Sequence, residues 1–280
     1  MSKSKKRNNH NSLKAYDNKK FIHSRDGRTI RILAEYLYPL RTFKNLGIQR
    51  MVIFFGSARV KPLDYLENEI SRLKSSLEKI NQEEKNHVTQ RINKLESLKT
   101  LSKYYDEAVE LAEMLTKWSI SLPKRFRFCI GTGGGPGLME AANKGAFLAG
   151  GKSAGLNISL PFEQHTNHFL TPELNLEFHY FFMRKFWFVY LAQALVVFPG
   201  GFGTLDELME ILTLTQTKKV KKPLPILLYG EEYWRNIINF NYMADLELIK
   251  EDDLKLFRFA NSPNEAFEYL QSELLKIFNL

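Results

Sequence analysis

The sequence predicts an α/β fold, specifically a Rossmann-like, doubly wound and mostly parallel sheet with helices on both faces. Short apolar runs alternate with helical patterns along most of the chain, which is typical of βαβ units. The apolar runs are continuous, as in strands that are buried on both faces. Two of these runs lead into glycine-rich loops that precede a helical pattern, and ligands of such folds bind where strands end and helices begin.

The first buried strand is expected at 51–55, directly before Gly56 and Ser57. Further strands are predicted at 126–130, 154–159, 194–198 and 224–229. Helices are predicted at 104–118, 138–148, 184–192, 205–216 and 263–278. Strands and helices that take turns in this way favour one continuous parallel sheet.

Residues 66–101 interrupt the alternation with a charged helical segment. An apolar stripe with alternating spacings of four and three residues passes through Leu66, Ile70, Leu73, Leu77 and Ile80. A second stripe passes through Val88, Ile92 and Leu95, after a polar break at 81–86. We therefore predict an inserted helical hairpin, because each seam needs only another helix to cover it. A structural insertion or a dimer contact is favoured over a specialised partner site.

The net charge of +9 comes from one end of the chain. Residues 1–50 contain 13 Lys and Arg against 3 Asp and Glu, whereas residues 51–280 have a net charge of −1. This distribution predicts a basic, flexible tail over 1–45 and a single domain over 46–280, with a short amphipathic stretch at 30–37. Basic runs of this kind are more often solvated than bound to RNA, so nucleic acid is a minor alternative as a partner.

Composition predicts a cytoplasmic protein that does not span a membrane. The single cysteine, Cys129, excludes an intramolecular disulfide and favours a reducing compartment. No secretory signal is visible, and the longest apolar run, 186–198, is shorter than the roughly 20 residues of a spanning helix. His165 and His168 have no companions at metal-ligand spacing. Neither a metal nor a cofactor is expected.

The first glycine loop, 131–137, contains five glycines in seven residues between a predicted strand and a predicted helix. Backbone N–H groups and the helix dipole favour an anion at such a place. The loop lacks the Rossmann spacing G-x-G-x-x-G, and the chain has no Walker loop. NAD and ATP are thereby disfavoured, whereas another phosphate-bearing ligand fits.

The second glycine loop, 199–203, also leads from a predicted strand into a helix. The following Thr204 and Glu207 have the spacing of a capping box, so local rules leave Glu207 open between a helix cap and a catalytic carboxylate. Arg184 and Lys185 lie among aromatic residues, where an unpaired charge is costly. Either a structural salt bridge or a cation directed toward a phosphate or base would explain them.

Five motifs together resemble one known family. They are FGSAR at 55–59, TGGGPGLMEAAN at 132–143, LNISLP at 156–161, MRK at 183–185 and PGGFGTLDE at 199–207. They resemble the Lonely Guy (LOG) family of nucleoside monophosphate phosphoribohydrolases, long labelled possible lysine decarboxylases. The resemblance covers roughly 50–240, apart from the hairpin at 66–101.

The resemblance implies a dimer-based Rossmann-like enzyme that cleaves AMP or N6-modified AMP, the cytokinin ribotides, into base and ribose 5-phosphate. Its catalytic arginine and glutamate correspond to Arg184 and Glu207. Its binding residues for the nucleoside 5′-monophosphate correspond to Gly133, Gly134, Gly135, Gly200, Gly201, Gly203, Thr204 and Lys185, with Ser57 as a weaker candidate. The chemistry agrees, since a carboxylate and a cation suit a positive sugar and a negative leaving base.

Two other functions are weighed against this one. A lysine decarboxylase needs pyridoxal phosphate on a lysine, and no pattern singles out Lys144 or Lys185 for that role. A Rossmann-like carrier or sensor that binds a nucleotide without cleaving it is the stronger rival, although the presence of both Arg184 and Glu207 argues against it.

Overall fold

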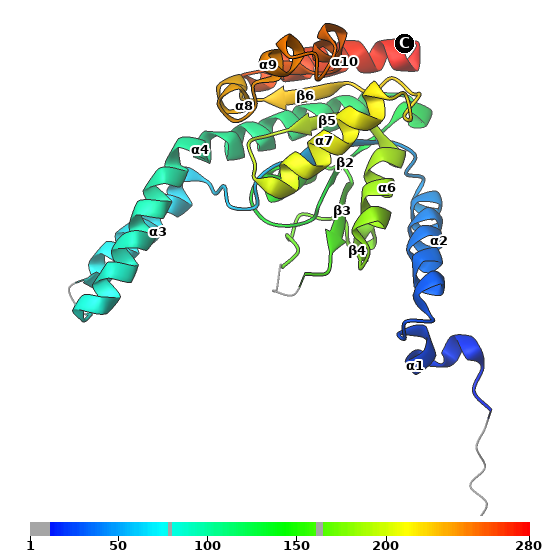
Figure 1. Cartoon of the computed structure of the whole chain (residues 1–280), viewed down its shortest axis with the longest axis horizontal. Coiled ribbons are helices and arrows are strands. Elements are labelled where there is room, and N and C mark those ends of the chain that lie inside the picture. The colour runs from blue at the N-terminus through cyan, green and yellow to red at the C-terminus, as the bar shows by residue number, and fades with distance from the viewer. Residues whose placement is uncertain (1–11, 78–79, 161–164) are drawn as a thin grey trace, which may run out of the picture.

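The computed structural model describes residues 12–77, 80–160 and 165–280 (Figure 1). Its centre is a seven-stranded sheet in the order β4-β3-β2-β1-β5-β6-β7, in which every neighbouring pair is parallel. The strands are β1 Met51–Phe55, β2 Cys129–Thr132, β3 Ser153–Ile158, β4 Asn175–Phe178, β5 Ala192–Val197, β6 Ile226–Tyr229 and β7 Arg258–Ala260. The predicted doubly wound α/β fold is confirmed.

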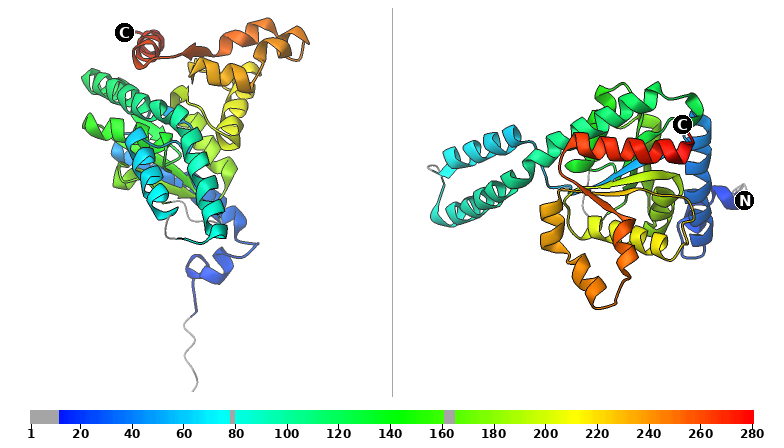
Figure 2. Two further views of the ribbon diagram at one scale, coloured as in Figure 1. Left: turned by 90° about the vertical axis from the view of Figure 1, so that its left-hand side faces the viewer. Right: turned by 90° about the horizontal axis from the view of Figure 1, so that it is seen from above.

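Helices cover both faces of this sheet (Figure 2). One face carries α4 Gln82–Ser121, α5 Leu138–Leu148 and α10 Pro263–Phe278, and the other carries α2 Arg28–Leu46, α6 Phe181–Leu191, α7 Phe202–Gln216, α8 Glu231–Ile237 and α9 Phe240–Asp245. Strand β1 serves both cores, with Val52 and Phe54 in the first and Met51, Ile53 and Phe55 in the second. Burial on both faces explains the continuous apolar runs.

The strand order reverses between β1 and β5. Strands β1 to β4 extend the sheet toward one edge, and β5 to β7 extend it toward the other. In open parallel sheets this reversal leaves a crevice outside the carboxyl ends of the strands. The fold therefore places the candidate site beyond β1, β2 and β5.

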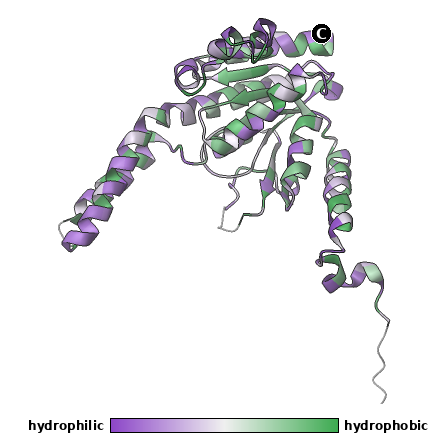
Figure 3. Cartoon of the chain, viewed as in Figure 1, coloured by the Kyte–Doolittle hydropathy of each residue, from purple (hydrophilic) through white to green (hydrophobic). Residues whose placement is uncertain are grey.

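The inserted hairpin stands away from the sheet (Figure 1). It consists of α3, Leu63–Ser76, and the first part of α4, with a small core of Leu66, Ile70, Ile92 and Leu95. Hydrophilic residues predominate along the two arms of the hairpin (Figure 3). Asn81 and Glu84 form a capping box that begins α4. Because α4 continues unbroken for 40 residues, the second arm and the helix predicted at 104–118 are one element.

Part of the predicted tail is folded. Helix α2 buries Pro39 and Phe43, and the side chain of Glu35 accepts hydrogen bonds from the backbone N–H groups of His179 (2.8 Å) and Tyr180 (3.2 Å). A flexible tail reaching to residue 45 is therefore wrong for 28–45, where the amphipathic stretch packs on α6. Before it lie a short 3-10 turn, Ala15–Asp17, and α1, Lys19–Ile22. Residues 1–11 lie outside the described residues, and their flexibility stays a prediction.

Several boundaries and elements differ from the prediction. The strand expected at 126–130 begins only at Cys129, because Lys124–Phe126 is a 3-10 turn. The sequence patterns do not reveal the edge strands β4 and β7, nor α8 and α9. Two further 3-10 segments lie at Pro172–Leu174 and Glu251–Leu256. Within the described residues, no helix combines the length and apolarity that crossing a membrane requires.

Replacing Glu35 tests whether α2 holds α6 in place. Glu35→Ala should lower the free energy of unfolding by about 1–3 kcal/mol, because two N–H groups lose a charged acceptor. Glu35→Gln keeps one acceptor oxygen and should lower the free energy of unfolding by less than Glu35→Ala does. Chemical denaturation measures the free energy of unfolding of both variants. A Glu35→Ala protein as stable as the parent would contradict a role for Glu35 in holding α6 in place.

Candidate functional site

Backbone hydrogen bonds join the three loops that follow β1, β2 and β5. The N–H of Ser57 donates to the carbonyl of Pro199 (3.0 Å), and the N–H of Leu138 donates to the carbonyl of Ser57 (3.0 Å). A Cβ on Gly56 would lie 2.8 Å from the Cβ of Leu138, so only glycine allows this approach. The loops after β1, β2 and β5 thus meet at the reversal of strand order.

The first glycine loop is fixed by buried amides that the sequence analysis missed. Asn167 donates through Nδ2 to the carbonyls of Gly134 (3.1 Å) and Gly135 (3.0 Å) and to Oδ1 of Asn143 (3.0 Å). Thr132 Oγ1 accepts from the N–H of Gly134 (2.9 Å) and donates to Asn143 (2.8 Å). The loop is therefore held in one shape. Gly133, within the same loop, is half-buried.

The second glycine loop presents an open backbone at the start of α7. Gly200 is buried under Thr204, and a Cβ there would overlap the threonine side chain. Gly201 and Gly203 are exposed, and an added Cβ would meet nothing within 4 Å. The first N–H groups of a helix have no partner within it. The exposed start of this helix is therefore a place where backbone N–H groups favour an anion.

The capping-box interpretation of Glu207 is wrong. Helix α7 begins at Phe202 with Gly201 as its N-cap and has no side-chain cap, so Thr204 and Glu207 lie inside the helix. Glu207 lies in its second turn, and its Oε1 accepts a hydrogen bond from Nη2 of Arg184 at 3.2 Å. The structure thus brings the two predicted catalytic residues into contact.

This ion pair is largely withdrawn from water. The side chain of Glu207 is 6% exposed and that of Arg184 is 14% exposed. The Arg184 guanidinium carbon lies 5.1 Å from the ring centre of Phe181 and 5.6 Å from that of Phe188. Burial lowers the pKa of Arg184, and burial raises the pKa of Glu207 to about 7 against the opposing effect of Arg184. Arg184 Nε is buried without a hydrogen-bond partner in the described structure.

Two other predicted binding residues have protein partners. Lys185 Nζ lies 2.9 Å from Oδ2 of Asp206 and 2.6 Å from Oε2 of Glu210, so it ties α6 to α7. Ser57 Oγ accepts a hydrogen bond from the N–H of Arg59 (3.1 Å) and remains beside the joined loops. A role for Lys185 in phosphate binding would require it to leave these carboxylates.

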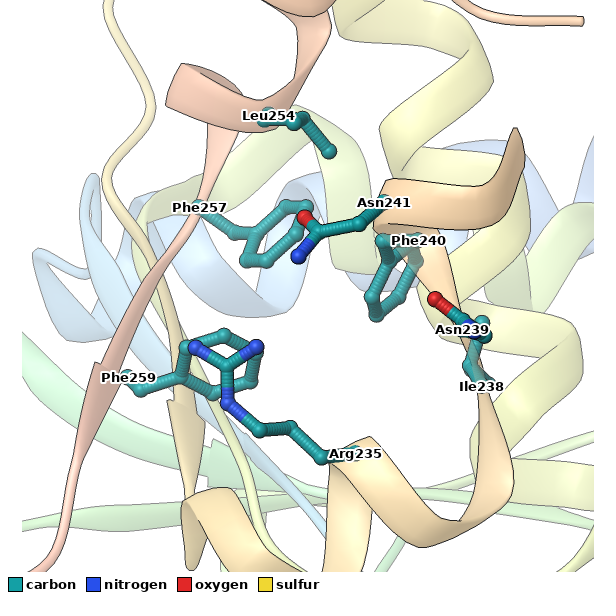
Figure 4. Close-up of a pocket in the computed structure, with 8 residues that line it drawn as sticks. All are labelled: Arg235, Ile238, Asn239, Phe240, Asn241, Leu254, Phe257 and Phe259. Carbon is teal, nitrogen blue, oxygen red and sulfur yellow. The ribbon is translucent and has the colours of Figure 1, made fainter. Parts of the chain in front are cut away.

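A cavity of about 330 Å³ lies elsewhere, between α8, α9 and β7 (Figure 4). Two of its polar residues already serve the fold: Arg235 is paired with Glu231 at 2.6 Å, and Asn239 caps α9. None of the predicted site residues lines it. Across the described ranges, no group of three or more His, Cys, Asp or Glu side chains is arranged to hold a metal ion.

Comparison with known proteins agrees with the motifs. The family described as "Possible lysine decarboxylase" matches residues 139–270. A "Probable cytokinin riboside 5'-monophosphate phosphoribohydrolase LOGL6" from Oryza sativa subsp. japonica is 26% identical over 172 residues. That alignment covers 60% of this chain and 64% of the rice protein, a little under two thirds of its length.

Solved structures also show similarity to the chain. The molybdenum cofactor carrier protein of Chlamydomonas reinhardtii is 18% identical with a TM-score of 0.45, covering 81% of this chain and 98% of its own. The molybdenum cofactor binding protein of Rippkaea orientalis is 18% identical with a TM-score of 0.43, covering 80% and 96%.

The fold and the joined glycine loops define a Rossmann-like α/β protein whose strand-end loops meet at the reversal of strand order. Within that class, the family match, the rice relative and the five motifs agree. The chain is similar to the possible lysine decarboxylase family over residues 139–270 and to the LOG protein of rice.

A pair of glycine substitutions tests the rigidity of the first loop. Gly134 and Gly150 have nearly the same φ, +73° and +71°, but a Cβ on Gly134 would overlap the side chain of Asn157, whereas one on Gly150 meets nothing within 4 Å. Gly150→Ala should cost about 1 kcal/mol for its backbone. Gly134→Ala should cost about 1–3 kcal/mol more. Equal losses in thermal unfolding would contradict the close packing of this loop.

Proposed function

We propose that the protein hydrolyses the N-glycosidic bond of a nucleoside 5′-monophosphate, AMP or an N6-modified AMP of the cytokinin ribotide type, to the free base and ribose 5-phosphate. The observation that carries the proposal is the contact of Arg184 with Glu207 at 3.2 Å, beside the strand-end glycine loops. Similarity to the LOG family and the activity named for the rice relative support it.

The phosphate is assigned to the second glycine loop. Gly201 and Gly203 are exposed at the N-terminal end of α7, a helix of 15 residues, where backbone N–H groups and the helix dipole favour an anion. Thr204 adds a hydroxyl in the first turn. Gly133 to Gly135 are assigned to the opposite wall, because their loop is joined to the second glycine loop through Ser57.

The sugar and base are assigned to the ion pair. Breaking the bond places positive charge on the ribose and negative charge on the departing base. The ionised carboxylate of Glu207 stabilises the sugar and orients its hydroxyls or the attacking water. Arg184 supports the leaving base with its positive charge.

Incubation with AMP, CMP, GMP and cytokinin ribotides, followed by chromatography of the released base, tests the activity. Release of base supports the hydrolase, and the relative rates identify the preferred base. Bound but intact nucleotide would instead favour the carrier.

Glu207→Gln should retain nucleotide binding and lose about 100-fold or more of turnover, because the neutral amide cannot stabilise the positive sugar. Asp206→Asn is the matched control, since Asp206 is adjacent and its side chain is 57% exposed. It should retain activity within a few-fold. Single-turnover base release measures both, and a fully active Glu207→Gln enzyme would remove this residue from the mechanism.

The raised pKa of Glu207 predicts a pH profile. Burial raises the pKa to about 7, so the carboxyl group is mostly protonated below that pH and ionised above it. If the ionised form acts, kcat/KM should rise through about pH 7 and level off above it. A profile that is flat across this range, or that falls through it, would contradict an essential carboxylate.

A further inference from the structure

Phe181 is an exposed aromatic ring in contact with the proposed catalytic arginine. It is the first residue of α6 and is 49% exposed. The guanidinium carbon of Arg184 lies 5.1 Å from its ring centre. The ring of Phe181 is thus half-exposed to solvent and contacts a cation of the proposed site.

The two rings beside Arg184 have different surroundings. Phe188 is 1% exposed and belongs to the core between the sheet and α6, so it forms the inner wall. Phe181 forms the outer wall and borders solvent. Its exposed ring is therefore available to a ligand that reaches the Arg184–Glu207 pair from solvent.

We infer that Phe181 is a base-recognition residue, on whose exposed ring the planar base of the nucleotide packs. This inference rests on the function proposed above. With the ribose at Glu207, the base is only one glycosidic bond away, and Arg184, which contacts both Glu207 and Phe181, spans that distance. Stacking on an aromatic ring is tolerant of base identity, so Phe181 contributes affinity for any nucleobase and leaves the choice among bases to other groups.

The next residue supplies a matched control. Phe182 is 48% exposed, nearly the same as Phe181, but its ring packs against Tyr180 with centroids 5.5 Å apart. Both phenylalanines are in the first turn of α6. They differ in that the ring of Phe181 contacts Arg184. A general loss of exposed apolar surface would therefore affect Phe181→Ala and Phe182→Ala alike, whereas loss of a contact with the base would affect Phe181→Ala alone.

Calorimetric titrations with AMP and with ribose 5-phosphate, which lacks the base, test the inference. They use the full chain carrying Glu207→Gln, so that AMP stays intact, alone and combined with Phe181→Ala, Phe181→Leu or Phe182→Ala. Phe181→Ala should weaken AMP binding by about tenfold and leave ribose 5-phosphate unchanged. Phe181→Leu keeps the apolar packing on Arg184 but lacks a ring and should also weaken AMP. Phe182→Ala should change neither ligand.

Three results would overturn the inference: AMP affinity within twofold of the parent in both Phe181 variants, equal weakening of AMP and ribose 5-phosphate, or the same loss in Phe182→Ala. Failure of AMP to bind the parent would overturn it as well. Base release by the unmodified chain separates this inference from the proposed hydrolysis. If the unmodified chain cleaves AMP but the Phe181 substitutions leave AMP binding unchanged, only the contact between Phe181 and the base is excluded. If the Phe181 substitutions selectively weaken AMP binding but the unmodified chain never cleaves AMP, only the proposed hydrolysis is excluded.

Discussion

The ion pair between Arg184 and Glu207 is the contact on which the arrangement of the site depends. A single buried charge is costly, and removing one partner of a buried pair leaves the other uncompensated. Burial lowers the pKa of Arg184 and raises that of Glu207, so for each partner it favours the neutral form. The two helices that carry the pair therefore have to keep one relative position, and Lys185 adds a second tie between them through Asp206 and Glu210.

The sheet and α2 determine where that pair lies. Helix α6 follows β4 and α7 follows β5, so both begin at the carboxyl edge of the parallel sheet. Glu35 binds the chain just before α6, and its carbonyl accepts from Nε1 of Trp187 (3.0 Å). Hydrogen bonds through Ser57 join the neighbouring loops. Groups far apart in sequence thus converge on one crevice, and a segment that composition alone describes as a tail supports the helix of the proposed catalytic arginine.

The sequence predicts those parts of the fold whose burial leaves a pattern. The helices at 138–148 and 263–278 match α5 and α10, and the central strands show as continuous apolar runs. Edge strand β4 exposes Asn175 and Glu177, so no such run marks it. For the site, motifs indicate Arg184 and Glu207 but not their contact, because they lie on different helices. Asn167 carries no pattern of its own, and only the folded chain shows that it holds the glycine loop.

The start of α7 explains why a local rule fails at Glu207. A capping box requires the threonine at the helix boundary, but the flexible backbone of the second glycine loop lets the helix begin three residues before Leu205, where the pattern places it. Glu207 is thereby moved from the first turn to the second and faces α6 instead of its own N-terminus. The same early start leaves first-turn N–H groups beside the exposed Gly201 and Gly203. Conflicts between local and tertiary preferences are expected at functional sites. Here the earlier start of α7 leaves backbone N–H groups exposed and also places the Glu207 carboxylate in contact with Arg184.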